Sequence, residues 1–322
     1  DRNYLYLAEK RGLTLRPETE ATWVKPLEGG GYEVEALEGL LPAPRRRQTF
    51  RARNVVFAGG VLGTVPLLLR LREDPRGLPK LSPRVGSFVR TNSEALIGVV
   101  SRRRDVDLSQ GIAITSILHT DAHSHVEPVR YPAGSNFFRT LGWPSVMGGN
   151  ALVRLARIAW ACLTRPRRIL GAVFVPEWAK QTLILLYMRT VEGCLRMRLG
   201  RSVRTGFARG VVTDLEDGPA PSAFMPEAFD LAERVARRLD GVPTTLATET
   251  LLGVPSTAHI LGGACMGATA EEGVIDHRHR VFGYDGLYVL DGAAVSANPG
   301  VNPSLTITAL AERAMTFVPG RG

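Results

Sequence analysis

The sequence predicts a mixed α/β (α+β) fold in which one α/β domain is interrupted by a second domain. An apolar strand, a glycine-rich turn and a helix follow one another over residues 54–71, and the same order of strand, loop and helix returns over residues 287–317. Between them, from about residue 80 to residue 239, short strand candidates alternate with basic helices. The predicted division is a first domain at residues 1–79, a second at residues 80–240, and a return to the first at residues 241–322.

The first 79 residues are expected to begin with a helix and to continue as strands. Apolar residues recur at helical spacing over residues 4–11, and Gly12 ends that helix. Residues 54–58 form a continuous apolar run, typical of a strand buried on both faces, and Gly59 leads into a helix that continues to residue 71. Strand-like segments are also predicted at residues 13–15, 21–24 and 32–36.

The middle of the chain contains one amphipathic helix and one long apolar strand. Residues 151–163 place apolar side chains on one face of a helix and Arg154 and Arg157 on another. Residues 178–189 contain an apolar run that suits a buried strand. The apolar face of the helix consists of Leu152, Leu155, Ala156 and Ala159.

The end of the chain is predicted as a strand at residues 287–290, a loop rich in glycine and proline, and a helix at residues 304–317. Asn302 stands where a helix N-cap belongs, and Pro303 stands at the first helical position, where its missing N–H costs nothing. The free N–H groups at such a helix start favour an anion or an electron-rich carbonyl, although plain capping explains the same residues.

Charge limits the partners that the chain is expected to bind. It has 40 Lys and Arg residues against 31 Asp and Glu residues, a net charge of +9, and only four of the basic residues are lysines. The arginine clusters are scattered and lack interleaved aromatic residues, so no nucleic-acid partner is expected. A basic and apolar surface favours an anionic membrane or a lipid, which leaves peripheral membrane contact open.

Cysteines and apolar runs limit the fold and the location. Cys162, Cys194 and Cys265 are far apart and lack CxxC spacing, which argues against a disulfide framework or a zinc ribbon. The longest uncharged stretch, residues 55–69, is broken by glycine and proline and is shorter than the roughly 18 apolar residues of a membrane-spanning helix. The chain opens with Asp1 in a helical pattern and shows no signal peptide. We therefore expect a cytoplasmic or membrane-peripheral protein whose chain was processed or begins within a longer one.

Two polar segments are candidates for chemistry. His259 precedes a glycine-rich apolar stretch, where a neutral histidine suits a general base, with a buried core histidine as the alternative. On a strand, His123, His125 and Glu127 would project from one face and suit a metal ion, but a loop with polar strand ends explains the neighbouring His119 and Asp121 as easily, and no metal is predicted. The sequence contains no GxSxG, P-loop, HExxH or GxGxxG motif, which argues against hydrolases, NTPases and zincins of those types.

Four motifs follow one another along the chain: VVFAGGVLGT at residues 55–64, HILGG at 259–263, GLYVLDG at 286–292 and GVNPSLT at 300–306. In this order and spacing they resemble the glucose-methanol-choline (GMC) oxidoreductases, which are FAD enzymes that oxidise alcohols. Residues 90–93 and 125–134 resemble the cholesterol oxidase branch. The resemblance implies an FAD/NAD(P)-binding-type domain and a substrate domain built on an antiparallel sheet. It covers the later part of such a protein, so the family's GxGxxG unit is expected upstream of Asp1.

The resemblance also implies roles for individual residues. His259 would orient the substrate hydroxyl and accept its proton while a hydride leaves for the flavin. Asn302 would lie near the flavin and the substrate oxygen, and Glu127 would carry a proton in a coupled migration of a double bond. The implied cofactor-binding residues are Gly292, Asp291, Asn302, Ser304, Gly60 and Ala21.

The implied reaction is oxidation of a 3-hydroxysteroid, or another bulky apolar alcohol, to a ketone with O2 as electron acceptor. Two alternatives stay open. One is a lipid-binding or partner-binding remnant that no longer binds flavin. The other is a dehydrogenase of the same family that passes electrons to a quinone or a cytochrome.

Overall fold

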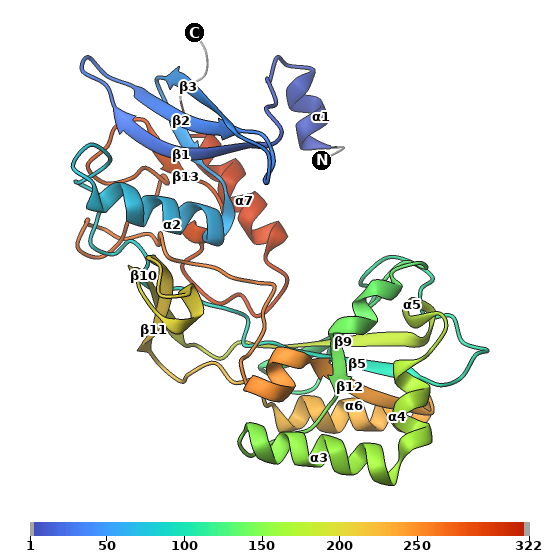
Figure 1. Cartoon of the computed structure of the whole chain (residues 1–322). Helices are drawn as coiled ribbons and strands as arrows, with labels where there is room; N and C mark the ends of the chain where they lie inside the picture. Colours follow the sequence, from blue (N-terminus) through green and yellow to red (C-terminus); the bar gives the residue numbers. More distant parts are fainter. Residues whose placement is uncertain (1–2, 319–322) are drawn as a thin grey trace.

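The computed structural model describes residues 3–318, which are arranged as two lobes joined by extended segments (Figure 1). In the first lobe an antiparallel meander lies beside a short helix: β1 (Thr19–Pro26), β2 (Tyr32–Glu38), β3 (Arg46–Ala52) and α1 (Tyr4–Glu9). The strand predicted at residues 13–15 is wrong, since these residues follow α1 as irregular chain and Leu13 and Leu15 are exposed. A strand needs a partner for its backbone groups, and this segment has none among the described strands.

A parallel pair of strands joins the two ends of the chain. β4 (Val55–Phe57) pairs with β13 (Leu287–Val289), so the two strand, turn and helix segments lie side by side. α2 (Gly60–Glu73) follows β4, and η4 (Gly292–Ala294) and α7 (Ser304–Met315) follow β13. The prediction that the first strand is buried on both faces is wrong for Val56, which is 44% exposed, because β4 packs on the core through Val55 and Phe57.

The core of the first lobe is built around α2. Its side chains Val61, Val65 and Leu68 are buried in one cluster with Val289 of β13. The cluster also contains Met197, which comes from the hairpin of β10 (Cys194–Gly200) and β11 (Gly210–Asp217), with η2 (Val203–Thr205) at its turn. This hairpin therefore packs on the first lobe, although its sequence lies between residues 80 and 240.

The second lobe is built on a six-stranded antiparallel sheet, as the sequence predicts for the substrate domain. The strand β12 (Gly241–Leu246) belongs to this sheet, although the predicted division assigns residues 241–322 to the first domain. From one edge to the other the strands are β6 (Leu118–His119), β7 (Ser124–Val129), β9 (Thr182–Arg189), β5 (Ala95–Ser101), β12 (Gly241–Leu246) and β8 (Gly142–Pro144). Together with the helices of both lobes, this sheet confirms the predicted α/β (α+β) class.

The two faces of this sheet differ. Side chains alternate between faces along a strand, and one set is buried under α6 (Pro226–Arg238). Glu127 follows Val126 in β7 and pairs with Leu186 of β9, so it projects from the face opposite α6. The residues under α6 are Ala95, Ile97, Val99, Val126, Leu185 and Tyr187.

The second lobe contains further helices. The predicted helix at residues 151–163 is confirmed as α3, and the predicted apolar strand within residues 178–189 is confirmed as β9. Among the described residues, no helix is long and apolar enough to cross a membrane. The helices are η1 (Asn136–Leu141), α3 (Ala151–Thr164), α4 (Pro166–Val173), α5 (Trp178–Gln181) and the π-helical turn η3 (Thr248–Leu252).

Candidate active site

Glu127 and Asn302 form a hydrogen-bonded pair between the two lobes. Nδ2 of Asn302 donates a hydrogen bond of 2.6 Å to Oε2 of Glu127. Glu127 is buried, and a buried carboxylate needs a donor to offset its lost hydration. The prediction that Asn302 caps a helix is wrong, because the N-cap of α7 is Pro303 and no side chain caps that helix.

The histidines near Glu127 do not build a metal site. Nε2 of His125 lies 3.5 Å from Oε1 of Glu127, and both side chains are buried. His123 precedes β7, is exposed, and lies 3.4 Å through Nδ1 from the hydroxyl of Thr190. Within residues 3–318, the structure contains no group of three His, Cys, Asp or Glu side chains that could hold a metal ion.

His259 is held by Glu94, a residue that no sequence motif marks. Nδ1 of His259 lies 2.6 Å from Oε2 of Glu94, and Oε1 of Glu94 accepts the N–H of Ala258. Burial would raise the pKa of Glu94, but hydrogen bonds from His259, Thr257 and Ala258 outweigh it and hold that pKa below its usual value. Glu94 is therefore ionised at neutral pH, and an ionised carboxylate can only accept hydrogen bonds.

The ionised Glu94 fixes the tautomer of His259. Because the carboxylate is an acceptor, Nδ1 of His259 carries the proton, and in the neutral ring Nε2 is left with its lone pair free. Nε2 of His259 forms no hydrogen bond to any described residue, and the side chain keeps 15% of its surface exposed. This geometry is that of a general base oriented by a buried carboxylate.

One short segment links the two pairs. Glu94 immediately precedes β5, and the side chain of Asn92 donates a 2.8 Å hydrogen bond to the carbonyl of Val301, the neighbour of Asn302. On the other side, Leu96 of β5 pairs with Leu186 of β9, which pairs with Glu127. Glu94 and Glu127 are thus linked through neighbouring strands of one sheet, and Asn302 is linked to the segment that precedes β5 through its neighbour Val301.

A second buried carboxyl group lies behind Glu94. Burial raises the pKa of Glu249 to about 7, although the N–H of Ser256 donates to Oε1 at 3.1 Å, and the charge of Glu94 raises it further. Glu249 lies in η3 between Thr248 and Thr250, and no sequence motif marks it as a functional residue. It places a group that titrates near neutral pH beside the pair of Glu94 and His259.

Three of the predicted cofactor residues, Gly60, Asp291 and Gly292, lie at the starts of α2 and η4. Oδ2 of Asp291 accepts the N–H of Gly60 at 2.8 Å, and Oδ1 accepts the N–H of Ala293 at 2.8 Å. The carbonyl of Gly292 accepts the N–H of Gly262, which ties the stretch after His259 to the same place. Both oxygens of the Asp291 carboxylate thus accept hydrogen bonds from the protein. The groups that could still bind a ligand in this region belong to the backbone.

Two features of this region leave room for a ligand. Gly60 has a φ of +68°, and a Cβ built on it would meet nothing within 4 Å. α7, which begins with Ser304, has neither a side-chain cap nor an acidic residue in its first turn, so its N–H groups are free to bind negative charge. Ala21 lies elsewhere, on β1 opposite Ala36 of β2.

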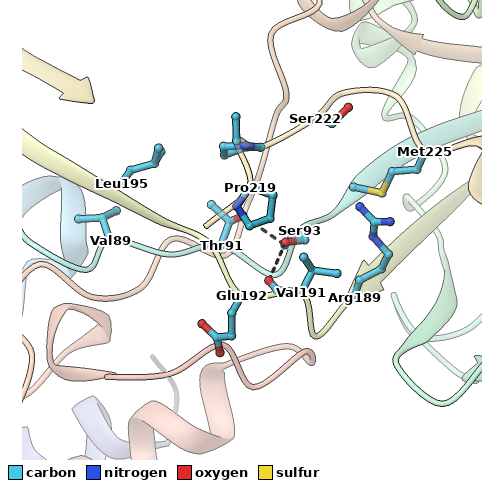
Figure 2. Close-up of a pocket in the computed structure, with 13 residues that line it drawn as sticks. Val89, Thr91, Ser93, Arg189, Val191, Glu192, Leu195, Pro219, Ser222 and Met225 are labelled. Carbon is cyan, nitrogen blue, oxygen red and sulfur yellow. Dashed lines mark hydrogen bonds between the residues drawn. The ribbon is translucent and has the colours of Figure 1, made fainter. Parts of the chain in front are cut away.

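Residues of the segment that carries Glu94 line two small cavities. The first, of about 60 Å³, is lined by Ser93, Glu192 and Pro219. Arg189 and Met225 also line it and lie to the right of Ser93 in Figure 2. The second, of about 110 Å³, shares Ser93 with the first and reaches Glu94 itself. Ligand pockets for molecules of drug size measure roughly 300–1,000 Å³, so neither cavity holds a sterol.

Comparison with known proteins defines the class. Residues 219–311 match the family model described as GMC oxidoreductase. This region, which contains His259 and Asn302, matches the GMC oxidoreductase family, in agreement with the resemblance predicted from the sequence. Enzymes of this family depend on FAD and act on CH–OH donors.

The similarity extends over the whole chain to particular relatives. A cholesterol oxidase from Acinetobacter baumannii is 40% identical over 326 residues, covering 100% of this chain and 58% of that protein. A cholesterol oxidase from Mycobacterium tuberculosis is 38% identical over 327 residues, covering 100% and 56%. The chain therefore spans a little over half the length of these relatives.

The solved structures support the fold. A pyridoxine 4-oxidase from Mesorbium loti superimposes with a TM-score of 0.53 at 16% identity, covering 93% of this chain and 57% of that one. At that identity the likeness concerns the arrangement of helices and sheets alone.

Proposed function

We propose that this chain carries the catalytic residues of an FAD-dependent oxidase that converts a 3-hydroxysteroid to the ketone with O2 as acceptor. The observation that carries the proposal is the pairing of His259 with the buried, ionised Glu94, which leaves Nε2 of the imidazole free as a base. The sterol as substrate and O2 as acceptor are supported by the names of the relatives that are 38–40% identical over the whole chain.

The free backbone groups described above fit FAD. The open space beside Gly60, the backbone around Gly292 and the uncapped start of α7 at Ser304 would hold its negatively charged and electron-rich parts. When bound, FAD supplies the acceptor for the hydride of the carbinol carbon.

His259 takes the hydroxyl proton of the substrate in this proposal. Nε2 accepts a hydrogen bond from the hydroxyl and then its proton, which makes the ring an imidazolium. Glu94 stabilises that cation through Nδ1 and keeps the ring from turning away. The carboxylate acts through His259, so it positions the base without touching the substrate.

Glu127 serves a second step, the migration of a double bond next to the new ketone. Its carboxylate takes a proton from one carbon of the steroid and returns it to another, which needs a base shielded from water. Glu127 is buried, and the hydrogen bond from Asn302 holds one of its oxygens in place. The other oxygen lies 3.5 Å from Nε2 of His125.

The test uses the complete gene product mixed anaerobically with cholesterol and, separately, with a small primary alcohol. The proposal expects loss of the oxidised flavin absorption with the sterol, and formation of hydrogen peroxide when air is admitted. Loss of absorption with the small alcohol alone would refute the sterol as substrate. Reduction without peroxide in air would instead indicate a dehydrogenase, and a protein without bound flavin would support the remnant.

A further inference from the structure

The helix α3 turns its apolar side to solvent. Within the helix, Leu152 is 76% exposed, Trp160 is 68% exposed and Leu163 is 77% exposed. These side chains share one face with two exposed alanines, Ala156 and Ala159. An amphipathic helix on a protein surface normally buries such a face, so α3 is inverted relative to the usual arrangement.

The inward side of α3 is fixed by an arginine. Arg154 is buried, and its guanidinium donates to the carbonyls of Thr250 and Leu251 in η3, at 2.6 and 2.9 Å. Together with Ile158 it is the buried part of the helix. These hydrogen bonds fix the orientation of α3, because Arg154 must face η3 to reach the two carbonyls.

The neighbouring helix continues the apolar surface. α4 is anchored by Ile169 and Ala172, which are buried against Val242 of β12. Its outer side exposes Leu170, Val173 and, just after the helix, Phe174. Figure 1 shows α3 along the outer edge of the second lobe, beyond α6, with α4 rising from one end of it.

The charged side chains of the segment that forms this surface are all basic. Residues 128–176 contain seven arginines and no aspartate or glutamate. Of these arginines, Arg157, Arg165 and Arg167 are exposed on α3 and at the corner where α4 begins. Aromatic and leucine side chains flanked by arginines are the composition that binds the interface of an anionic lipid bilayer.

We propose that α3 and α4 dock the protein on a membrane surface that contains anionic lipids. We define the lipid-facing surface as Leu152, Trp160, Leu163, Leu170 and Phe174. The helices lie in the plane of the interface, with these side chains among the acyl chains and the arginines at the headgroups. The inference goes beyond the proposed oxidation and does not depend on it.

The charges decide against a second copy of the chain as the occupant. A symmetric contact through this surface would bring Arg157, Arg165 and Arg167 of both copies close together, with no acidic residue of either segment to neutralise them. A lipid surface offers the opposite charge and accepts any arrangement of apolar side chains.

The test measures sedimentation of the complete gene product with vesicles of phosphatidylcholine, alone or mixed with phosphatidylglycerol. Binding is expected to the mixed vesicles and to fall as salt is added. Replacing both apolar residues in Leu152→Glu/Leu163→Glu should weaken it at least tenfold. The matched control is Val203→Glu in η2, because Val203 is 78% exposed but lies outside the lipid-facing surface. Arg165→Gln/Arg167→Gln should weaken binding about fivefold per arginine on the mixed vesicles alone.

Trp160 reports insertion directly. Brominated phosphatidylcholine in the mixed vesicles should quench part of the tryptophan fluorescence, and Trp160→Phe should bind but lose that quenching. Circular dichroism, flavin content and turnover of detergent-dissolved sterol should match the unaltered protein in every variant. This separates a failure of docking from a failure of the proposed reaction.

Three results would overturn the inference. One is absence of sedimentation with the mixed vesicles, or equal sedimentation of Leu152→Glu/Leu163→Glu. The second is a dimer in analytical ultracentrifugation without lipid that the same double substitution dissociates, because a second copy would then cover the surface. The third is shielding of Trp160 from acrylamide without vesicles, because the protein's own chain would then cover it.

Discussion

Nδ1 of His259 lies 2.6 Å from Oε2 of Glu94, although the two residues are 165 positions apart in the chain. The carboxylate is buried and held ionised by three hydrogen-bond donors, so it sets both the direction of the imidazole and its tautomer. The proposed chemistry therefore depends on a pair, of which the motif around His259 contains only one member.

Replacing the carboxylate of Glu94 should disable the base without removing the flavin. We expect Glu94→Gln to lower kcat about 10²-fold. The amide can donate an N–H to Nδ1 as well as accept from it, so the tautomer of His259 is no longer fixed, and the neutral amide does not stabilise the imidazolium. Glu94→Asp should recover part of the loss. The measurements are steady-state turnover and flavin absorbance, with Glu233→Gln on the exposed side of α6 as the matched control. An unchanged kcat in Glu94→Gln would contradict the positioning role.

Glu127→Gln should separate the two chemical steps. Oxidation should continue near the original rate, while migration of the double bond should slow by about 10²-fold or more, because the amide cannot carry the proton. The conjugated ketone absorbs in the ultraviolet and peroxide reports oxidation, so both steps are measured in one sample. Equal loss of both signals would mean that Glu127 serves the oxidation instead.

Asp291→Ala should loosen the joint between α2 and η4. The substitution leaves the N–H groups of Gly60 and Ala293 and the hydroxyl of Thr64 without their acceptor. Unmade hydrogen bonds of buried groups cost about 1–3 kcal/mol each, so we expect a loss of several kcal/mol in unfolding free energy, together with lower flavin content. Urea unfolding measures the first, and a midpoint unchanged from that of the unaltered protein would show that Asp291 does not tie these elements.

Glu249 should make stability depend on pH. Its carboxyl has a pKa raised from 4.5 to about 7 in the folded protein, so the folded state keeps a proton that the unfolded chain releases. The stabilisation is complete below pH 4.5 and is lost as pH rises through about 7, an effect of about 3 kcal/mol. Glu249→Gln should remove this part of the pH dependence. Urea unfolding at about pH 5 and about pH 8 measures it, and parallel curves for both proteins would contradict the assignment.

The sequence predicted the elements whose signal is local. The apolar runs before Gly59 and Asp291 became β4 and β13, and the helical periodicity of residues 151–163 became α3. The parallel pairing of these two strands is not predictable from either run alone. Residues 13–15 show the limit of such signals, because an apolar run becomes a strand only if a neighbour takes its hydrogen bonds.

The parts that were not predictable depend on contacts between distant residues. Asn302 has the sequence position of a helix cap, but α7 begins one residue later than the pattern indicates, and the amide nitrogen of Asn302 donates to the distant Glu127. Glu94 and Glu249 carry no motif, and their pKa values are set by burial and by donors from other elements. The orientation of α3 follows from the carbonyls of η3 that Arg154 reaches, which the helical pattern cannot reveal.

The central claim is that His259 is the base for oxidation of the alcohol. Its most direct test is the rate of flavin reduction by a 3-hydroxysteroid, measured by anaerobic stopped flow in the complete gene product and in its His259→Ala variant. We expect equal flavin content and a rate of reduction that falls by about 10²–10⁴-fold in the variant. Equal rates of reduction in the two proteins would contradict the assignment of His259.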